Sequence, residues 1–101
     1  MVNSNDGLDL EPARPHLQRL LSSRAFPKTI CPSEVARAMS TAELHMAGAS
    51  TWRDLMPALR RLAFQLRDGG TVDVLQKGNV LPRTQSLENT TGPIRLRMVQ
   101  Q

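Results

Sequence analysis

The sequence predicts a mostly helical α+β domain, and three observations support this fold class. Residues 50–70 form the longest periodic segment, with apolar residues at the spacing of one helical face. Two shorter helical patterns precede it, at about residues 12–23 and 32–39. After Gly69-Gly70 the apolar period changes to strict alternation, which is typical of β-strands.

The long helix has recognisable ends and one irregular position. Ser50 or Thr51 can serve as its N-cap, and Asp54 lies in the first turn, where the helix dipole favours an acid. Pro57 removes a backbone donor, so we expect a kink there or a fresh helix start. Gly69-Gly70 ends the helix. Its apolar face contains Trp52, Leu55, Met56, Leu59, Leu62, Ala63 and Leu66.

The chain before the long helix divides into an arm and three shorter elements. Residues 1–12 are expected to be a disordered arm, because they have no periodicity and little to bury. The domain then occupies residues 13–101, beginning with a helix that ends near Ser23. The β-prone segment 28–31 precedes a second helix that starts at Pro32. Residues 40–49 can add one or two helical turns.

The C-terminal third predicts a β-hairpin. Val72 and Val74 alternate with polar residues, and the run from Ile94 to Met98 alternates in the same way, so the two runs should pair antiparallel. The connection, residues 78–92, is too long for a tight turn and is expected to be a mobile loop. The order of elements is that of a winged helix, with a three-helix core, a helix-turn-helix and a C-terminal β-hairpin wing.

Composition limits the possible partners and locations. With 101 residues the chain suits one domain, and its net charge of +4 and pI near 10.6 favour polyanionic partners. A single cysteine excludes an internal disulfide and is typical of a reducing cytoplasm. The sequence has no long apolar run and no signal-like N-terminus, so we expect a cytoplasmic protein without membrane contact. We expect a monomer or a homodimer.

Four motifs resemble those of the DUF3253 family of small bacterial proteins. They are Lys28-Thr29-Ile30-Cys31-Pro32-Ser33-Glu34-Val35-Ala36-Arg37-Ala38, Trp52-Arg53-Asp54-Leu55-Met56-Pro57, Gln76-Lys77-Gly78 and Gly92-Pro93-Ile94-Arg95-Leu96. The resemblance covers roughly residues 17–98. It implies a winged-helix-like fold in a bacterial cytoplasm, and it implies no activity. Compared with the family, the segments 40–50 and 78–92 look long.

The leading functional hypothesis is a nucleic-acid-binding module with duplex DNA or another nucleic acid as partner. Arginines recur along one side of the long helix, and further cations fall on the predicted wing, where they can contact phosphates. The candidate contact residues are Arg53, Arg60, Arg61, Arg67, Lys77, Arg83, Arg95 and Arg97. The alternative is a solvated arginine face with one exposed phenylalanine, Phe64.

Two other hypotheses rest on fewer residues. A protein partner could dock on an apolar patch formed by Met39, Met46, Phe64 and the long loop, residues 78–92. Cys31, at the predicted start of the second helix, could be a reactive thiol of a redox sensor or a small buried residue.

Catalytic and metal chemistry have little support in the sequence. One cysteine and two histidines lack the paired spacing of zinc sites, and no phosphate-binding glycine loop is present. We therefore expect no metal, no cofactor and no enzymatic activity.

Overall fold

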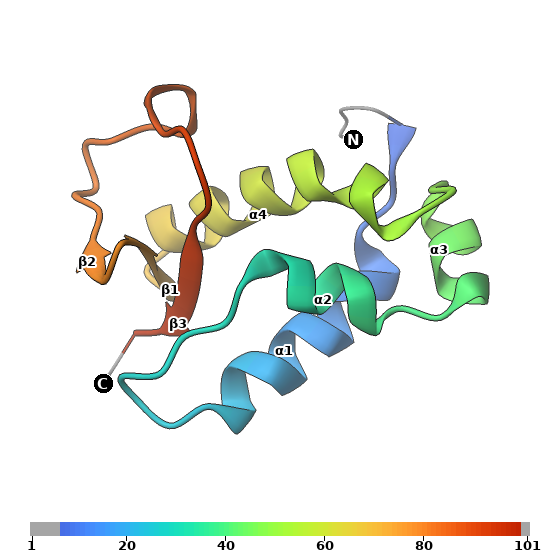
Figure 1. Cartoon of the computed structure of the whole chain (residues 1–101), viewed down its shortest axis with the longest axis horizontal. Coiled ribbons are helices and arrows are strands. Elements are labelled where there is room, and N and C mark those ends of the chain that lie inside the picture. The colour runs from blue at the N-terminus through green and yellow to red at the C-terminus, as the bar shows by residue number, and fades with distance from the viewer. Residues whose placement is uncertain (1–6, 100–101) are drawn as a thin grey trace.

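The computed structural model describes residues 7–99, and their order confirms the predicted α+β fold with a winged-helix arrangement. Helices form one end of the molecule and a small sheet the other (Figure 1). The elements are the 3-10 helix η2 (Glu11–Ala13), α1 (Arg14–Ser23), α2 (Pro32–Ala38), α3 (Thr41–Ala47), η3 (Trp52–Leu55), α4 (Met56–Asp68), β1 (Val72–Gln76), β2 (Asn79–Val80), η4 (Leu87–Asn89) and β3 (Arg95–Met98).

The two short helices α2 and α3 begin at carboxylate-assisted caps. The Glu34 carboxylate accepts from the backbone N–H of Cys31 at 2.8 Å, which satisfies a donor at the start of α2. At α3 the Ser40 hydroxyl accepts from the N–H of Glu43, whose carboxylate accepts from the Ser40 N–H. Gly48 ends α3 with a φ of +86°, a left-handed conformation that glycine adopts without a Cβ penalty.

The long periodic segment divides at its proline, as the sequence predicts. Residues 52–55 form η3, and α4 starts afresh with Pro57 in its first turn, where the missing N–H costs no hydrogen bond. The Asp54 carboxylate accepts from the N–H groups of Ser50 and Thr51. Gly70, with a φ of +84°, turns the chain out of α4 into β1.

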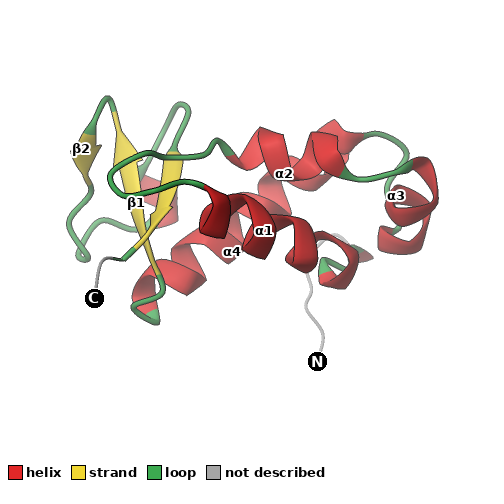
Figure 2. Cartoon of the chain, turned by 90° about the horizontal axis from the view of Figure 1, so that it is seen from below, coloured by secondary structure: helices red, strands yellow, loops and turns green. Residues whose placement is uncertain are grey.

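The sheet has the strand order β2-β1-β3 and is antiparallel throughout (Figure 2). In the β1–β3 pair, Val74 lies opposite Leu96. Ile30 forms a β-bridge with Leu96 on the outer side of β3, with backbone hydrogen bonds of 2.8 Å in both directions. This single bridge lies in the β-prone segment predicted before α2, and it ties the N-terminal half of the chain to the sheet.

Helix and sheet share one aliphatic core. Leu55, Leu59 and Leu62 of the long segment are at most 5% exposed, and they pack in the same cluster as Val72 and Val74 of β1. Trp52, Met56 and Leu66, on the margin of the predicted apolar face, are only partly buried. The spacing therefore identified the centre of the buried face but missed Ala58 and Phe64, which are also buried.

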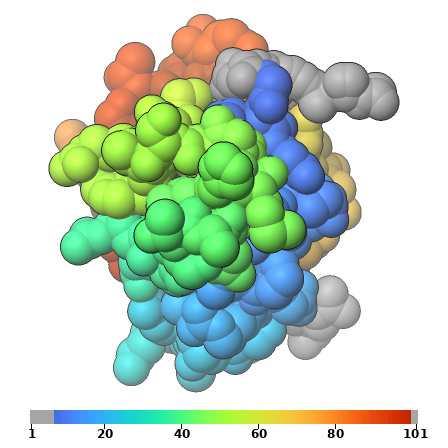
Figure 3. Space-filling view, turned by 90° about the vertical axis from the view of Figure 1, so that its right-hand side faces the viewer, coloured from blue at the N-terminus to red at the C-terminus, as the bar shows by residue number. Residues whose placement is uncertain are grey.

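The prediction of a disordered arm at residues 1–12 is wrong for residues 7–12. Leu8 and Leu10 pack against the core, and the N–H of Asp9 donates to the carbonyl of Ala47 at 3.0 Å. In the space-filling view, the blue N-terminal segment lies directly beside α3 (Figure 3). Two leucines in an otherwise polar stretch are enough to hold residues 7–12 in place. Residues 1–6 lie outside the described part of the chain.

The prediction for the loop between β1 and β3 is also wrong. The sequence predicts a mobile connection, but β2 and η4 lie within it and it folds back against α4. The turn into β2 is tight because Lys77 and Gly78 both adopt positive φ, 51° and 83°. Beyond β2, Thr90 is 5% exposed, and its hydroxyl donates to the carbonyl of Ser86 at 2.8 Å.

Among residues 7–99, no helix combines the length and the apolar character needed to cross a lipid bilayer.

Candidate nucleic-acid interface

Arg67, predicted to contact phosphate, is instead a buried structural residue that is 4% exposed. Its guanidinium donates to the carbonyl of Gln85 at 2.6 Å, lies within 3.4 Å of the carbonyls of Pro82 and Arg83, and pairs with Asp68 at 2.8 Å. The Pro82 carbonyl also accepts from the backbone N–H of Gln85, whereas Arg67 supplies the donors for the carbonyls of Gln85 and Arg83. Arg67 is therefore unavailable for nucleic acid.

The alternative hypothesis of a solvated arginine face includes an exposed Phe64, but this side chain is buried and only 5% exposed. The guanidinium of Arg67 lies over its ring at 4.7 Å from the centroid. The loop that Arg67 binds also covers this side of α4, where η4 contacts the helix. The sequence did not reveal this contact, because the covering loop is irregular and has no periodic pattern.

The two arginines of β3 have different surroundings. Arg97 pairs with Asp73 on β1 at 3.1 Å, and its guanidinium lies over the Phe26 ring. That charge is neutralised within the sheet. Arg95 is exposed and donates to the hydroxyl and carbonyl oxygens of Thr29, with the Glu34 carboxylate at 4.0 Å.

Arg60 is held in place but keeps its charge. Its two Nη atoms donate to the carbonyls of Gly92 at 2.8 Å and Thr90 at 3.0 Å. Carbonyl oxygens satisfy the N–H groups without cancelling the positive charge, unlike the carboxylates beside Arg67 and Arg97. Arg60 therefore both fixes the loop before β3 and adds positive potential there.

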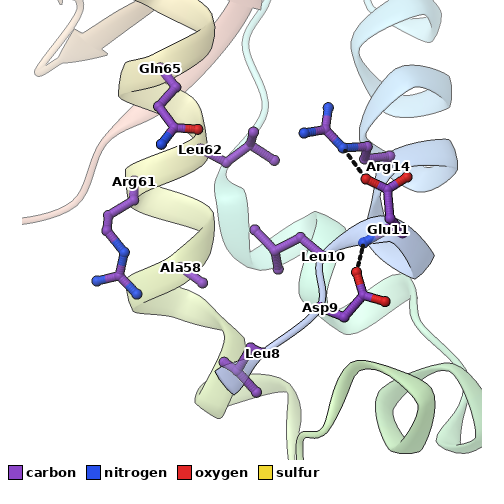
Figure 4. Close-up of a pocket in the computed structure, with 9 residues that line it drawn as sticks. All are labelled: Leu8, Asp9, Leu10, Glu11, Arg14, Ala58, Arg61, Leu62 and Gln65. Carbon is purple, nitrogen blue, oxygen red and sulfur yellow. Dashed lines mark hydrogen bonds and ion pairs between the residues drawn. The ribbon is translucent and has the colours of Figure 1, made fainter. Parts of the chain in front are cut away.

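Arg61 and Arg83 lie along a different side of α4, beside pockets of mixed charge. Figure 4 shows one of them, between the segment Leu8–Arg14 and α4, with Arg61 and Gln65 on the helix side. Together, three adjoining pockets on this side are lined by five arginines and five carboxylates: Arg14, Arg53, Arg61, Arg67 and Arg83 against Asp9, Glu11, Asp54, Asp68 and Glu88. A nearly balanced surface gives no net attraction for a polyanion.

A second pair of pockets has cations and no carboxylate in its lining. One lies between α2, α4 and the loop before β3, with Arg60 and Met56 in its wall. The next contains Lys77 and Arg95. Gly92 and Pro93 belong to both, so the two pockets are contiguous. In Figure 1 the loop leading into β3 passes in front of α4.

Trp52 extends this surface toward the start of the long helical segment. The guanidinium of Arg53 lies over its ring at 4.5 Å, and that of Arg37, from the last turn of α2, lies at 5.6 Å. Both arginines are exposed. Met56, one turn farther along, is part of the pocket beside Arg60. We call this surface the basic face, and it comprises Arg37, Trp52, Arg53, Arg60, Lys77 and Arg95.

Four of the eight predicted contact residues thus share one surface. These are Arg53, Arg60, Lys77 and Arg95, although Arg53 stands at its edge and also lines a pocket of mixed charge. The sequence prediction missed Arg37 as a contact residue and gave Trp52 a mainly structural role. Their proximity depends on the packing of α2 against η3, which no local pattern encodes.

Glu34 lies beside Arg95 of the basic face, and it is already paired with another arginine. It pairs with Arg24 at 2.7 Å. This bond lowers the pKa of the Glu34 carboxyl below its usual value, and the backbone N–H of Cys31 lowers the pKa further. One carboxylate between Arg24 and Arg95 leaves the surroundings of the face positive.

Cys31 lies at the N-cap of α2, as predicted, and is partly buried. The Ser33 hydroxyl donates to its sulfur at 3.0 Å. The thiol also lines the pocket that contains Met56 and Arg60. It lies near the basic face and remains a candidate reactive group.

The apolar docking patch predicted for a protein partner does not exist as a surface. Met39 is 7% and Phe64 is 5% exposed, because both pack in the core. Met46 alone of the three is exposed, at 68%. Within the part of the chain that the structure describes, no cluster of three or more His, Cys, Asp or Glu side chains could hold a metal ion.

Comparison with known proteins identifies a family without assigning an activity. No curated protein matches the chain. The family model DUF3253, described as a protein of unknown function, matches residues 11–99, which span the sheet, the core helices and the whole basic face. The chain therefore belongs to the DUF3253 family.

Proposed function

We propose that this protein is a nucleic-acid-binding module that uses the basic face. The observation that supports it is the composition of the contiguous pockets between α2, α4 and the sheet, whose lining contains Arg60, Lys77 and Arg95 but no carboxylate. Phosphate backbones are attracted to such surfaces without any need for sequence-specific contacts.

The arrangement of the cations also supports the proposal. Arg37 and Arg53 stand at the α2–η3 end of the basic face, and Lys77 stands at the tip of the β1–β2 hairpin. Cations at both ends can contact several phosphates of one strand. Since Arg60 and Arg95 are held by backbone carbonyls, the middle of the face loses little conformational entropy on binding.

The direct test is a titration of the full chain with nucleic acid at several salt concentrations. Affinity should fall as salt rises, with a slope that reflects the number of phosphates neutralised. The charge reversals Arg53→Glu and Lys77→Glu should each weaken binding by about tenfold or more and reduce the salt slope by about one to two.

Arg83→Glu is the matched control. It changes the net charge by the same amount, but Arg83 lines a pocket with Asp68 and Glu88 on the other side of α4. Binding that is indifferent to salt, or an Arg83→Glu effect as large as that of Arg53→Glu, contradicts the proposal.

The proposal includes a bacterial cytoplasmic setting, where the free thiol of Cys31 would stay reduced and nucleic acid is accessible. The DUF3253 match assigns no competing activity.

A further inference from the structure

The side of α4 that a duplex-binding helix would use is walled in. A helix reads duplex DNA by entering a major groove about 12 Å wide, so its outer side must project. Here the loop after β2 covers the C-terminal half of α4, and Phe64 and Arg67 are 5% and 4% exposed. On the N-terminal half, the segment that carries Leu8 and Leu10 forms the opposite wall of a pocket (Figure 4). The long helix is recessed between two parts of its own chain.

The basic face has a different character, because apolar groups lie between its cations. Met56 and Pro93 line the pockets that contain Arg60 and Arg95, and Trp52 lies one turn from Met56. Proteins that bind single strands combine a cationic groove for the backbone with apolar or aromatic groups for unstacked bases. A paired duplex keeps its bases stacked inside and offers nothing to such groups.

The Trp52 cluster supplies a prepared stacking site. Guanidinium groups of Arg37 and Arg53 lie over the indole at 5.6 and 4.5 Å from the ring centroid. A guanidinium held on a ring keeps its outer side free for a base and its N–H edge free for a phosphate. Both arginines are exposed, so an incoming strand can reach them.

From this geometry we infer that the partner is single-stranded nucleic acid. A base stacks on the Arg37–Trp52–Arg53 cluster, and the backbone follows the positive surface past Arg60 and Arg95 toward Lys77. The inference rests on the proposed function and specifies its partner.

The experiment compares one labelled oligonucleotide of mixed sequence with the same strand annealed to its complement, at one salt concentration. The full chain should bind the single strand about tenfold more tightly than the duplex, since stacking of even one base supplies such a factor. Trp52 is the only tryptophan, so its intrinsic fluorescence should change as the single strand binds.

Two variants that each replace an arginine by uncharged glutamine test where the single strand binds. Arg53→Gln should weaken single-strand binding by about tenfold, and Arg83→Gln, with the same loss of charge, should leave it within about twofold. Neither side chain is buried, so both variants should fold, and their thermal unfolding verifies this. Trp52→Phe keeps a ring under the arginines and should retain most of the affinity.

Each contrary result has a distinct meaning. Salt-dependent duplex binding that equals or exceeds single-strand binding overturns this inference and leaves the proposed function standing. No binding to either form overturns both. Single-strand binding with unchanged fluorescence and equal effects of the two glutamine variants overturns the assignment to the Trp52 cluster.

Discussion

Arg53 and Arg67 belong to the same helical stripe in the sequence, yet one is exposed and the other is buried. Their chemistry is identical, so the difference comes from their neighbours. Arg53 lies over Trp52 at the surface, whereas Arg67 binds loop carbonyls and Asp68. A charge pattern alone cannot distinguish these roles, because the irregular loop that buries Arg67 carries no periodic signal.

Substitution of Arg67 by methionine should destabilise the fold by about 2–4 kcal/mol. The change keeps a long apolar stem but removes the guanidinium that donates to the carbonyls of Gln85 and Arg83. Urea unfolding of the wild-type protein and of Arg67→Met measures the difference in unfolding free energy. Arg83→Met, at an exposed position, should stay within about 0.5 kcal/mol of the wild type. Equal effects of the two substitutions would refute the structural role of Arg67.

Glu34 makes stability depend on pH in the acid range. Its pKa in the folded state lies below the usual value of 4.5, chiefly because of the hydrogen bond from Arg24. A lowered folded-state pKa gives stabilisation that is complete above the unfolded-state pKa and is lost as pH falls through the folded-state value. The difference in unfolding free energy between wild type and Glu34→Gln should therefore shrink as pH falls below about 4.5.

Arg24→Gln tests the cause of this behaviour. It removes the largest contribution to the lowered pKa of Glu34, so the wild-type advantage over this variant should also shrink in acid. Denaturant midpoints at neutral pH and in acid provide both comparisons. A difference that is constant across this range would contradict the assignment.

At the scale of elements, sequence periodicity located the regular structure well. The predicted division at Pro57 and the antiparallel pairing of β1 with β3 are both confirmed. Each depends on local chemistry: a missing backbone donor or alternating side chains. The prediction that the loop between β1 and β3 is mobile was wrong, because single side chains, among them Arg60 and Thr90, hold the loop in place.

Substitution of Thr90 by valine should loosen this loop. The buried hydroxyl donates to the carbonyl of Ser86 and accepts from the Gln85 side chain at 3.0 Å. Valine keeps the shape but removes both hydrogen bonds, at a cost of about 1–3 kcal/mol. Limited proteolysis should then cleave the loop after β2 faster than in the wild type. Thr90→Ser retains the hydroxyl and should protect the loop; equal cleavage of both variants would contradict this role.

At the scale of the whole molecule, the N-terminal segment is part of the folded body. Leu8 and Leu10 precede the first residue matched by the family model, yet they pack against the core. Few residues and no periodicity made this packing unpredictable from sequence. The basic face also belongs to this scale, because α2, η3, α4, the turn between β1 and β2, and β3 each contribute to it.

Leu10→Ser should therefore lower the unfolding free energy by about 1–2 kcal/mol, through loss of partly buried apolar surface. Thermal unfolding followed by circular dichroism measures the change. Met46→Ser, at a residue 68% exposed in α3, is the control and should have little effect. An unchanged midpoint for Leu10→Ser would show that the segment adds nothing to stability.

The bridge between Ile30 and Leu96 has a consequence for the order in which the protein folds. The helices α2, α3 and α4 and the strand β1 all lie between its two residues in the sequence. During synthesis, Ile30 therefore leaves the ribosome well before the residue with which it pairs. The sheet can close over Ile30 only once β3 has been made, so this contact forms later than the local contacts within the helices.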